Sequence, residues 1–234
     1  MKVDRSLFWL LALAVWLGGC GDNSVNDNIR IAAGETREGG ARSVNGNIIV
    51  ANGATMEGDI SSVNGSIDID EQATVANVKT VNGSIRLDNG ASAGKLESVN
   101  GNVRLRADVR AAKIRLVNGT LDTESGTEIA GDITLVNGST RLAGTRIKGQ
   151  LTQMAGDVTI TDGSILEGNL LIKKEKGAVF KGDEPRIVVG PGSEVKGSII
   201  AEREIKLLVH ESATVGVVEG AEVQQFSGSP DALD

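Results

Sequence analysis

Residues 62–70, which read SVNGSIDID, place an Asn-Gly pair inside an alternation of apolar and polar residues. The same pattern returns at residues 80–88 as TVNGSIRLD and at residues 98–105 as SVNGNVRL. Alternation with a period of two is typical of a β-strand with one apolar face. Frequent glycine and β-branched residues disfavour a helix. The return of one short strand with the same two turn residues indicates a repeat architecture.

The Val-Asn pair recurs at intervals of 18 or 19 residues, at Asn26, Asn45, Asn64, Asn82, Asn100, Asn118 and Asn137. Glycine follows each of them except Asn26, and a degenerate copy, QMAGDVTI, carries Ala155 in the place of the asparagine. A fixed period of this size predicts a solenoid, because coils stacked about 4.8 Å apart bury apolar faces that one strand cannot bury alone. We therefore predict an all-β fold, a single-stranded parallel β-helix with coils of 18–20 residues, over residues 24–220.

A shorter rhythm divides each coil. Ten apolar residues lie six positions apart, at Val63, Ile69, Val75, Val81, Leu87, Ala93, Val99, Leu105, Ala111 and Val117. Three intervals of six make one 18-residue coil, which predicts three sides per coil and one inward residue on each side. A 19-residue coil then needs one additional residue at a corner, as a β-bulge provides.

Stacked coils would place the asparagines of the Val-Asn-Gly motif above one another. Asn and Gly tolerate left-handed backbone conformations, so the pair is expected to turn a corner of the coil. The asparagine amides could then form a ladder of hydrogen bonds, each contributing about 1 kcal/mol and fixing the register of the coils. The alternative is a series of hairpins, for which Asn-Gly is a strong signal. Hairpins leave the six-residue rhythm unexplained, so we favour the coil.

The chain begins with the basic residues Lys2 and Arg5, followed by the apolar run LFWLLALAVWLGG. A basic start, a short apolar run and small residues before a boundary are typical of an export signal. The sequence LGGC, which ends at Cys20, resembles a bacterial lipobox, in which the cysteine is lipidated after cleavage. An ordinary signal peptide or an N-terminal anchor helix is the alternative. We expect residues 1–19 to be a lipoprotein signal peptide, Cys20 to be the lipidation site and residues 20–23 to be a lipidated tether.

Charge and anchoring predict where the mature chain resides. Loss of residues 1–19 would change the formal charge from −7 to −8, and an acidic surface repels phosphate groups, which disfavours nucleic acid as a partner. Several acyl chains, at about 0.8 kcal/mol per buried methylene, would make the membrane the first partner. An acidic residue directly after the cysteine resembles an inner-membrane retention signal. In this chain Gly21 directly follows Cys20, and the acidic Asp22 comes one position later. We therefore expect a bacterial cell-envelope protein, at the outer membrane (periplasmic or surface face) rather than the inner one.

The downstream part is less regular. Residues 172–186, which begin IKKEKGAVFKGDEP, are expected to form an irregular coil or loop. The stretches IVVGPGSEVKGSI and LLVHESATVGVVEG align at a shift of 20 residues and continue the coils to about residue 220. Residues 221–234 are polar and acidic and are expected to be a disordered tail.

Few side chains could carry catalysis. His210, the only histidine, follows an apolar strand, where a corner position is more common than a general base. Asp68, Asp70 and Glu71 form the densest acidic cluster of the coils and are expected to be a solvated face. Cys20 is the only cysteine, which disfavours a thiolate nucleophile or a zinc site. We therefore expect no enzyme, no cofactor and no metal.

The glycine-punctuated coils TMEGDI, EVKGSI and KGAVFKG resemble those of bactofilins, which are polymer-forming cytoskeletal proteins. They also resemble bacterial putative-adhesin repeat proteins. The bactofilin resemblance implies a right-handed β-helix that associates end to end without a nucleotide. The six-residue rhythm and VVGPGSEV also resemble left-handed hexapeptide β-helices, which remain the alternative to the right-handed winding that we expect.

These features predict a non-enzymatic, lipid-anchored structural protein that acts as a scaffold, spacer or self-assembling element. The predicted contacts are a membrane, through the N-terminal acyl chains, and a second copy of the chain, end to end. The sequence identifies no protein partner. An adhesin-like surface binding module is the first alternative. A carbohydrate-active β-helix enzyme is the second, although sugar sites normally use aromatic platforms and this chain has no tyrosine.

Overall fold

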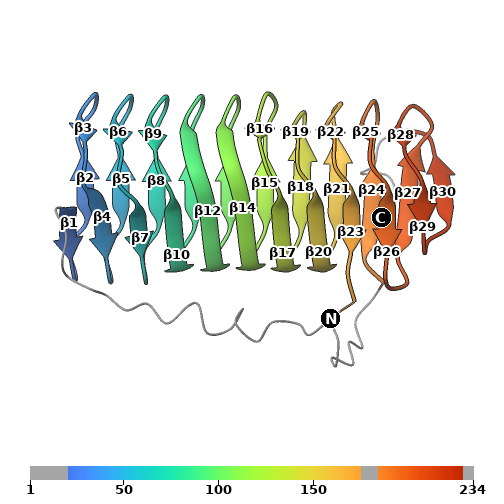
Figure 1. The fold of residues 1–234 in the computed structure, drawn as a ribbon, viewed down its shortest axis with the longest axis horizontal. Helices are drawn as coiled ribbons and strands as arrows, with labels where there is room; N and C mark the ends of the chain where they lie inside the picture. Colours follow the sequence, from blue (N-terminus) through green and yellow to red (C-terminus); the bar gives the residue numbers. More distant parts are fainter. Residues whose placement is uncertain (1–20, 175–183, 229–234) are drawn as a thin grey trace.

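The computed structural model describes residues 21–174 and 184–228. Over these ranges the chain has no helix and forms a parallel β-solenoid of about ten turns, which follow one another along the long axis of the molecule (Figure 1). The expected signal peptide, Cys20, the centre of the expected loop at residues 172–186 and residues 229–234 of the expected tail lie outside the described residues.

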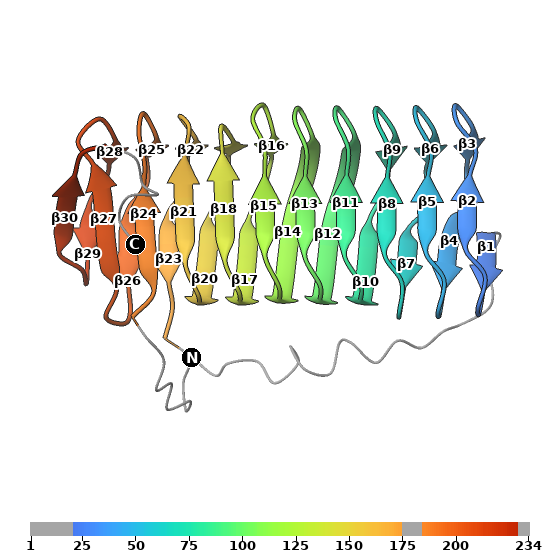
Figure 2. The ribbon, with the colours of Figure 1, turned by 180° about the vertical axis from the view of Figure 1, so that it is seen from behind.

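The first sheet has eleven strands, which follow the Val-Asn-Gly corner or its equivalent in each coil. Figure 2 shows them side by side in one row. They are β2 (Ile29–Ile31), β5 (Ile48–Val50), β8 (Ile67–Ile69), β11 (Ile85–Leu87), β13 (Val103–Leu105), β15 (Leu121–Thr123), β18 (Thr140–Ala143), β21 (Val158–Thr161), β24 (Arg186–Val189), β27 (Lys206–His210) and β30 (Val223–Phe226).

The second sheet has nineteen strands in two rows. The row before the corner comprises β1 (Gly21–Ser24), β4 (Gly40–Ser43), β7 (Ile60–Ser62), β10 (Val78–Asn82), β17 (Ile133–Asn137), β20 (Leu151–Ala155), β23 (Leu170–Ile172), β26 (Ile199–Ala201) and β29 (Val218–Glu219). The other row comprises β3 (Thr36–Arg37), β6 (Thr55–Met56), β9 (Thr74–Val75), β16 (Glu128–Ile129), β19 (Arg146–Ile147), β22 (Ile165–Leu166), β25 (Glu194–Val195) and β28 (Thr214–Val215). Two longer strands connect the rows, β12 (Ser92–Asn100) and β14 (Arg110–Asn118).

The strand register confirms the predicted repeat. Asn82 pairs with Asn100, Asn100 with Asn118 and Asn118 with Asn137, all in parallel. Equivalent residues of successive coils therefore stack, and the hairpin alternative is wrong because it requires antiparallel neighbours. The three-sided cross-section and the right-handed winding stay predictions.

The interior is a continuous aliphatic column. Ile67, Ile85 and Val103 pair with one another in the first sheet and have no exposed surface. Leu96 and Ile114 stack in the same way in the second sheet. Each fully buried side chain of this size contributes about 1.5–3 kcal/mol, so the column holds the coils together along the whole length.

One column of the six-residue rhythm faces outward, against the prediction. Val63 and Val81 are partly exposed, whereas Ser62 and Thr80, which precede them, are buried. The corner between β9 and β10 causes this reversal, because inward residues there are Val75 and Val78, three positions apart. Inward residues of one strand are an even number of positions apart. An odd interval at a corner therefore makes the residues of the next strand that would have faced inward face outward.

The solenoid extends beyond both predicted ends. β1 begins at Gly21 and pairs with β4, so residues 21–23 belong to the first coil and not to a tether. β30 pairs with β27, so the prediction of a disordered tail is wrong for residues 223–226. These residues carry too few apolar side chains to mark a strand, but β27 offers an unpaired edge on which they can add.

The predicted irregularity lies between β23, which ends at Ile172, and β24, which begins at Arg186. Ile172 pairs with Ala201, an interval of 29 residues, while Gln153 pairs with Ile172 at an interval of 19. The additional residues therefore form an insertion in one coil, and the stack continues in register on both sides of it.

The motif glycine is required by a close contact between coils. A Cβ atom on Gly65 would collide with the carbonyl oxygen of Gly46, and a Cβ atom on Gly83 would collide with that of Gly65. Every other residue type would force the two corners apart. The same collision recurs at Gly101, Gly119 and Gly138.

The Asn-Gly pairs of the motif lie at a corner of the coil, as expected, but the asparagines there are not left-handed. All seven lie within the described residues and none has a positive φ. Left-handed residues gather at a different corner, between the first sheet and the short strands of the second, where Gly53, Gln72, Gly90 and Asp108 have φ values of 57–69°. Sequence reasoning attended to the Asn-Gly pairs of the Val-Asn-Gly motif and missed those in ANGA and DNGA, which make this second corner.

The two glycine classes predict different costs of substitution. We expect Gly65→Ala to destabilise the fold by about 3 kcal/mol, because its Cβ atom meets backbone that the stack cannot move. Gly53→Ala is the control: its Cβ atom would meet nothing within 4 Å, so only the strain of its φ of 66° remains, about 1 kcal/mol. Urea unfolding followed by circular dichroism measures both. Equal unfolding midpoints for the two variants would contradict the contact argument.

Candidate functional site

A ladder of asparagine side chains runs along one corner of the solenoid. In each rung the Nδ2 of one asparagine donates to the Oδ1 of the asparagine in the preceding coil, at 2.8–3.0 Å. The ladder joins all seven asparagines of the motif: Asn26, Asn45, Asn64, Asn82, Asn100, Asn118 and Asn137. All seven side chains are exposed, so the ladder forms a surface edge.

The six hydrogen bonds of the ladder share one direction, since the donor always belongs to the later coil. Aligned amides polarise one another, which strengthens each bond. The ladder stops at Asn137, because its partner in the next coil is Ala155. The ladder therefore ties together the coils of the N-terminal part, while the later coils rely on backbone pairing and the core.

A second polar column lies inside the same corner. The hydroxyl groups of Ser62, Thr80 and Ser98 donate to the carbonyl oxygen of the motif glycine one coil earlier, at 3.2–3.4 Å. These three side chains are at most 3% exposed. The hydroxyl groups therefore satisfy backbone carbonyls that the turn removes from the sheet ladder. Sequence reasoning missed this column, although the Ser or Thr two positions before each of the first five asparagines, from Asn26 to Asn100, signalled it.

Where the Val-Asn-Gly motif ends, the side chain of Gln153 hydrogen-bonds to the carbonyl oxygen of the last motif glycine, Gly138. Its side chain is fully buried, and its Nε2 donates to the carbonyl oxygen of Gly138 at 2.6 Å. Its Oε1 accepts a hydrogen bond from Thr140 at 2.8 Å. The polar groups of this buried amide are therefore satisfied, as a core position requires.

The three residues of the acidic cluster, Asp68, Asp70 and Glu71, differ in exposure. Asp68 lies in β8 between Ile49 and Arg86 and is partly buried, whereas Glu71 is exposed. Burial raises the pKa of Asp68; Arg86 opposes the shift, and Asp70 adds to it. Arg86 itself donates to Asp88 at 2.9 Å. The cluster therefore holds one carboxyl group that ionises with difficulty on an outward column.

His210 occupies a corner next to the last strand. Its ring meets Phe226 edge to face, with ring centroids 5.1 Å apart, and it is 9% exposed. Its Nδ1 accepts a hydrogen bond from the backbone N–H of Ser212 at 3.1 Å. The structure thus places the histidine as a packing residue that fastens β30 to β27.

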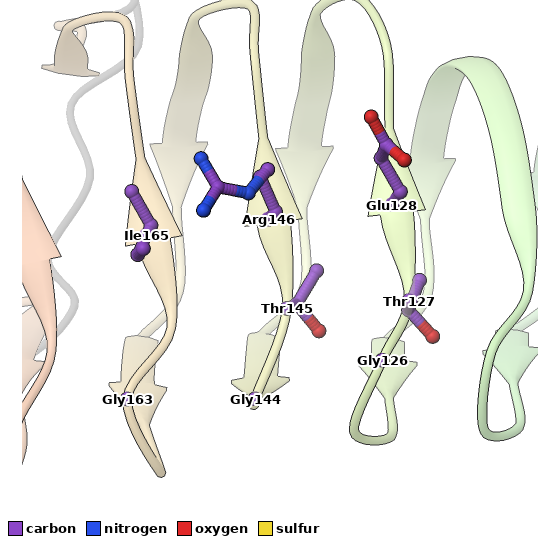
Figure 3. A pocket seen from close by; sticks show the side chains of 8 residues that line it. All are labelled: Gly126, Thr127, Glu128, Gly144, Thr145, Arg146, Gly163 and Ile165. Carbon is purple, nitrogen blue, oxygen red and sulfur yellow. The ribbon is translucent and has the colours of Figure 1, made fainter.

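A depression of about 250 Å³ spans three coils near the left-handed corner (Figure 3). Its polar side chains are engaged within the solenoid: Thr127 donates to the carbonyl oxygen of Arg106 at 3.0 Å, and Thr145 lies 2.6 Å from the hydroxyl of Thr123. Arg146 pairs with Glu167 at 2.7 Å. The depression is therefore a shallow trough between stacked turns, with its donors already used.

A second depression, of about 300 Å³, lies at the first coil and is lined by Gly21, Asp22, Arg37, Glu38, Gly39 and Gly40. Arg37 pairs there with Asp22 and, at 2.5 Å, with Glu35. This charged network covers the side of the first coil. Neither depression is lined by His210 or by the acidic cluster around Asp68.

Within residues 21–174 and 184–228, no three His, Cys, Asp or Glu side chains come together in a group that could hold a metal ion. No helix in these ranges has the length and apolarity to cross a bilayer. Comparison with protein-family models, curated proteins and solved structures gave no match to this chain. The fold and its register therefore define the class, a parallel β-solenoid.

The ladder predicts a specific loss of stability. We expect Asn82→Ala to lower the free energy of unfolding by about 1–2 kcal/mol, because Asn82 both donates to Asn64 and accepts from Asn100. Asn89→Ala is the control, since Asn89 is also exposed and its side chain forms no hydrogen bond among the described residues. Denaturant unfolding of the two variants measures the difference. An unchanged unfolding midpoint for Asn82→Ala would show that the ladder does not stabilise the fold.

Asp68 predicts a stability difference that depends on pH. Its pKa is raised in the folded chain, so the ionised form destabilises the fold at neutral pH, and this cost disappears below the ordinary value of 3.8. We expect Asp68→Asn to raise the melting temperature at about pH 7 and to leave it unchanged at about pH 3.

Asp122→Asn, in the same outward column, is the control for this prediction. Asp122 accepts from Arg141 at 3.2 Å, so its loss should lower the melting temperature at neutral pH. Calorimetry over the pH series measures both variants. A lower melting temperature for Asp68→Asn at neutral pH would contradict the argument from burial.

Proposed function

We propose that this chain is a non-enzymatic, lipid-anchored structural protein of the bacterial cell envelope. In this proposal the solenoid is a rigid rod about 50 Å long that acts as a scaffold, a spacer or a self-assembling element. The observation that carries the proposal is the unbroken coil-on-coil register, from the pairing of β1 with β4 to that of β27 with β30.

Rigidity follows from the way each coil contacts only its neighbours. Three kinds of interaction act at every interface within the ladder region: parallel backbone pairing, the aliphatic column and the asparagine rung. Bending the rod would have to loosen all three on one side at once. Such a body holds a fixed length, which suits a spacer or scaffold better than it suits a gate or hinge.

The lipobox-like LGGC supports the anchor. In the proposal, Cys20 carries the acyl chains and the membrane is the first partner. β1 begins at Gly21, the next residue, so a lipidated Cys20 would hold the first coil directly at the membrane surface. The cell envelope, and within it the outer membrane, is the proposed location because Asp22 does not directly follow the cysteine.

The ends of the rod differ, which bears on self-association. Among the described strands, those of the first coil (β1, β2 and β3) and of the last (β28, β29 and β30) pair on one side only. In the last coil Val217 and Val223 are 64% and 42% exposed. The first coil carries the charged network of Arg37. If copies add end to end, as resembling proteins do, the C-terminal coil is the end that favours addition, because its unpaired strand edges adjoin exposed valines, whereas those of the first coil adjoin the charged network.

A binding module of the adhesin type is the second candidate function. The observation that favours it is a row of valines on the outside of the rod, including Val63 and Val81, which are only partly buried. Aliphatic rows on a surface are typical of contact sites.

The anchor is tested with Cys20→Ala in full-length protein expressed in a Gram-negative bacterium. We expect labelling with a tagged fatty acid to be lost, and the protein to leave the membrane fraction, because Cys20 is the only cysteine. Asp22→Asn, which keeps the cysteine, is the control and should remain labelled. Persistent labelling of Cys20→Ala, or unchanged membrane association, would remove the lipid anchor from the proposal.

A further inference from the structure

One outward column of the solenoid is aliphatic in eight successive coils. Its members directly precede the ladder asparagines or their equivalent, and they are Val25, Val44, Val63, Val81, Val99, Val117, Val136 and Met154. Val25 is 57% exposed and the other seven are partly exposed. At about 4.8 Å per coil this valine column forms a straight apolar stripe about 35 Å long on one side of the rod.

The interior does not require these aliphatic side chains, since they face away from it. The adjacent outward column, two positions earlier in the same strands, shows what such positions accept: Arg42, Ser61, Lys79, Glu97, Arg115 and Thr134. Polar and charged residues of both signs therefore fit this face. An aliphatic residue in eight successive coils of the neighbouring column is typical of a surface that another apolar surface covers.

We propose that the valine column is the contact surface of a side-by-side dimer, in which a second copy of this chain packs antiparallel against the first. The two-fold axis crosses the rods between the coils of Val81 and Val99. Val81 then faces the partner's Val99, and Val44 faces the partner's Val136. With this axis all eight aliphatic residues of each copy meet an aliphatic residue of the other, from Val25 to Met154.

The adjacent charged column selects this register. An axis perpendicular to the rod and within the contact plane makes each column face itself in reverse order. Lys79 then faces the partner's Glu97, and Arg42 faces the partner's Thr134. Within one chain, Glu97 already pairs with Lys95 at 2.6 Å. In the dimer, Lys79 of the second copy would be a second cation beside the Glu97 carboxylate. Opposite charges across the contact favour the complex and set its register.

Moving the axis by half a coil in either direction removes this match. An axis through the coil of Val81 would bring Lys79 against the partner's Lys79 and Arg42 against the partner's Arg115. An axis through the coil of Val99 would bring Glu97 against the partner's Glu97. Like charges at such positions repel, so of these three registers only the one centred between the two coils is free of repulsion.

This inference goes beyond the proposed function and is independent of the lipid anchor. It concerns the side of the rod, whereas end-to-end association would use the terminal coils. The chain carries a formal charge of −7, which opposes self-association in general, so the dimer depends on the apolar stripe and the local charge match.

The oligomeric state of the full chain, solubilised in detergent, tests the contact. We expect light scattering after size exclusion to give a dimer for the wild type and a monomer for the double variant Val81→Lys/Val99→Lys. The control is Ile49→Lys, which places the same charge on an outward, partly exposed aliphatic position of the first sheet and should leave the dimer intact. Unchanged circular dichroism melting shows that the variants fold. A monomeric wild type, or a dimeric double variant, overturns the proposal.

Disulfide trapping tests the direction of pairing. Val44→Cys and Val136→Cys lie five coils apart, so the antiparallel dimer predicts a disulfide in a mixture of the two variants and none in either alone. Wild-type protein, with Cys20 only, gives the background. A homodimeric disulfide of Val44→Cys indicates parallel rods and overturns the antiparallel arrangement. A disulfide between Val44→Cys and a different envelope protein assigns the valine column to another partner and overturns it too.

Discussion

Parallel stacking of one coil on the next is the constraint on which the rest of the structure depends. Once Asn82 lies over Asn64 and under Asn100, each side chain position becomes a column, and each column has a single environment along the rod. An error of one residue in any coil would exchange its inward and outward side chains. The ladder and the motif glycine both act against such errors, the first by attraction and the second by close contact.

These two devices complement each other at one corner. The asparagine amide draws adjacent coils together from outside, while Gly65 lets the backbone approach the carbonyl oxygen of Gly46 from within. The buried hydroxyl of Ser62 then satisfies that same carbonyl oxygen. The asparagine and the glycine continue without the hydroxyl group at Asn118 and Asn137, where Leu116 and Leu135 take its place, so the ladder and the close contact are the more constant pair.

A solenoid built in this way has sides and ends of different character. The first sheet carries alternating charges, such as Arg104, Asp122 and Arg141, whose ion pairs add solubility and a small stabilisation of up to about 1 kcal/mol each. The corner beside the ladder carries the valine column, and the last coil exposes Val217 and Val223. The proposed rod therefore offers distinct contacts along its side and at its end, and the first coil adjoins the proposed anchor.

The sequence alone was sufficient for the repeat, the parallel all-β class and the alignment of the seven asparagines, because a strict period forces equivalent residues to stack. It did not indicate that the Val81 side chain faces outward, or that residues 223–226 form a strand. Which face Val81 takes depends on the odd interval at the preceding corner, from Val75 to Val78, and the composition does not reveal where a chain turns. Residues 223–226 become β30 only because the edge of β27 is available to pair with them. Local patterns determine what repeats, whereas contacts with the neighbouring coil decide which way each side chain faces and where the stack ends.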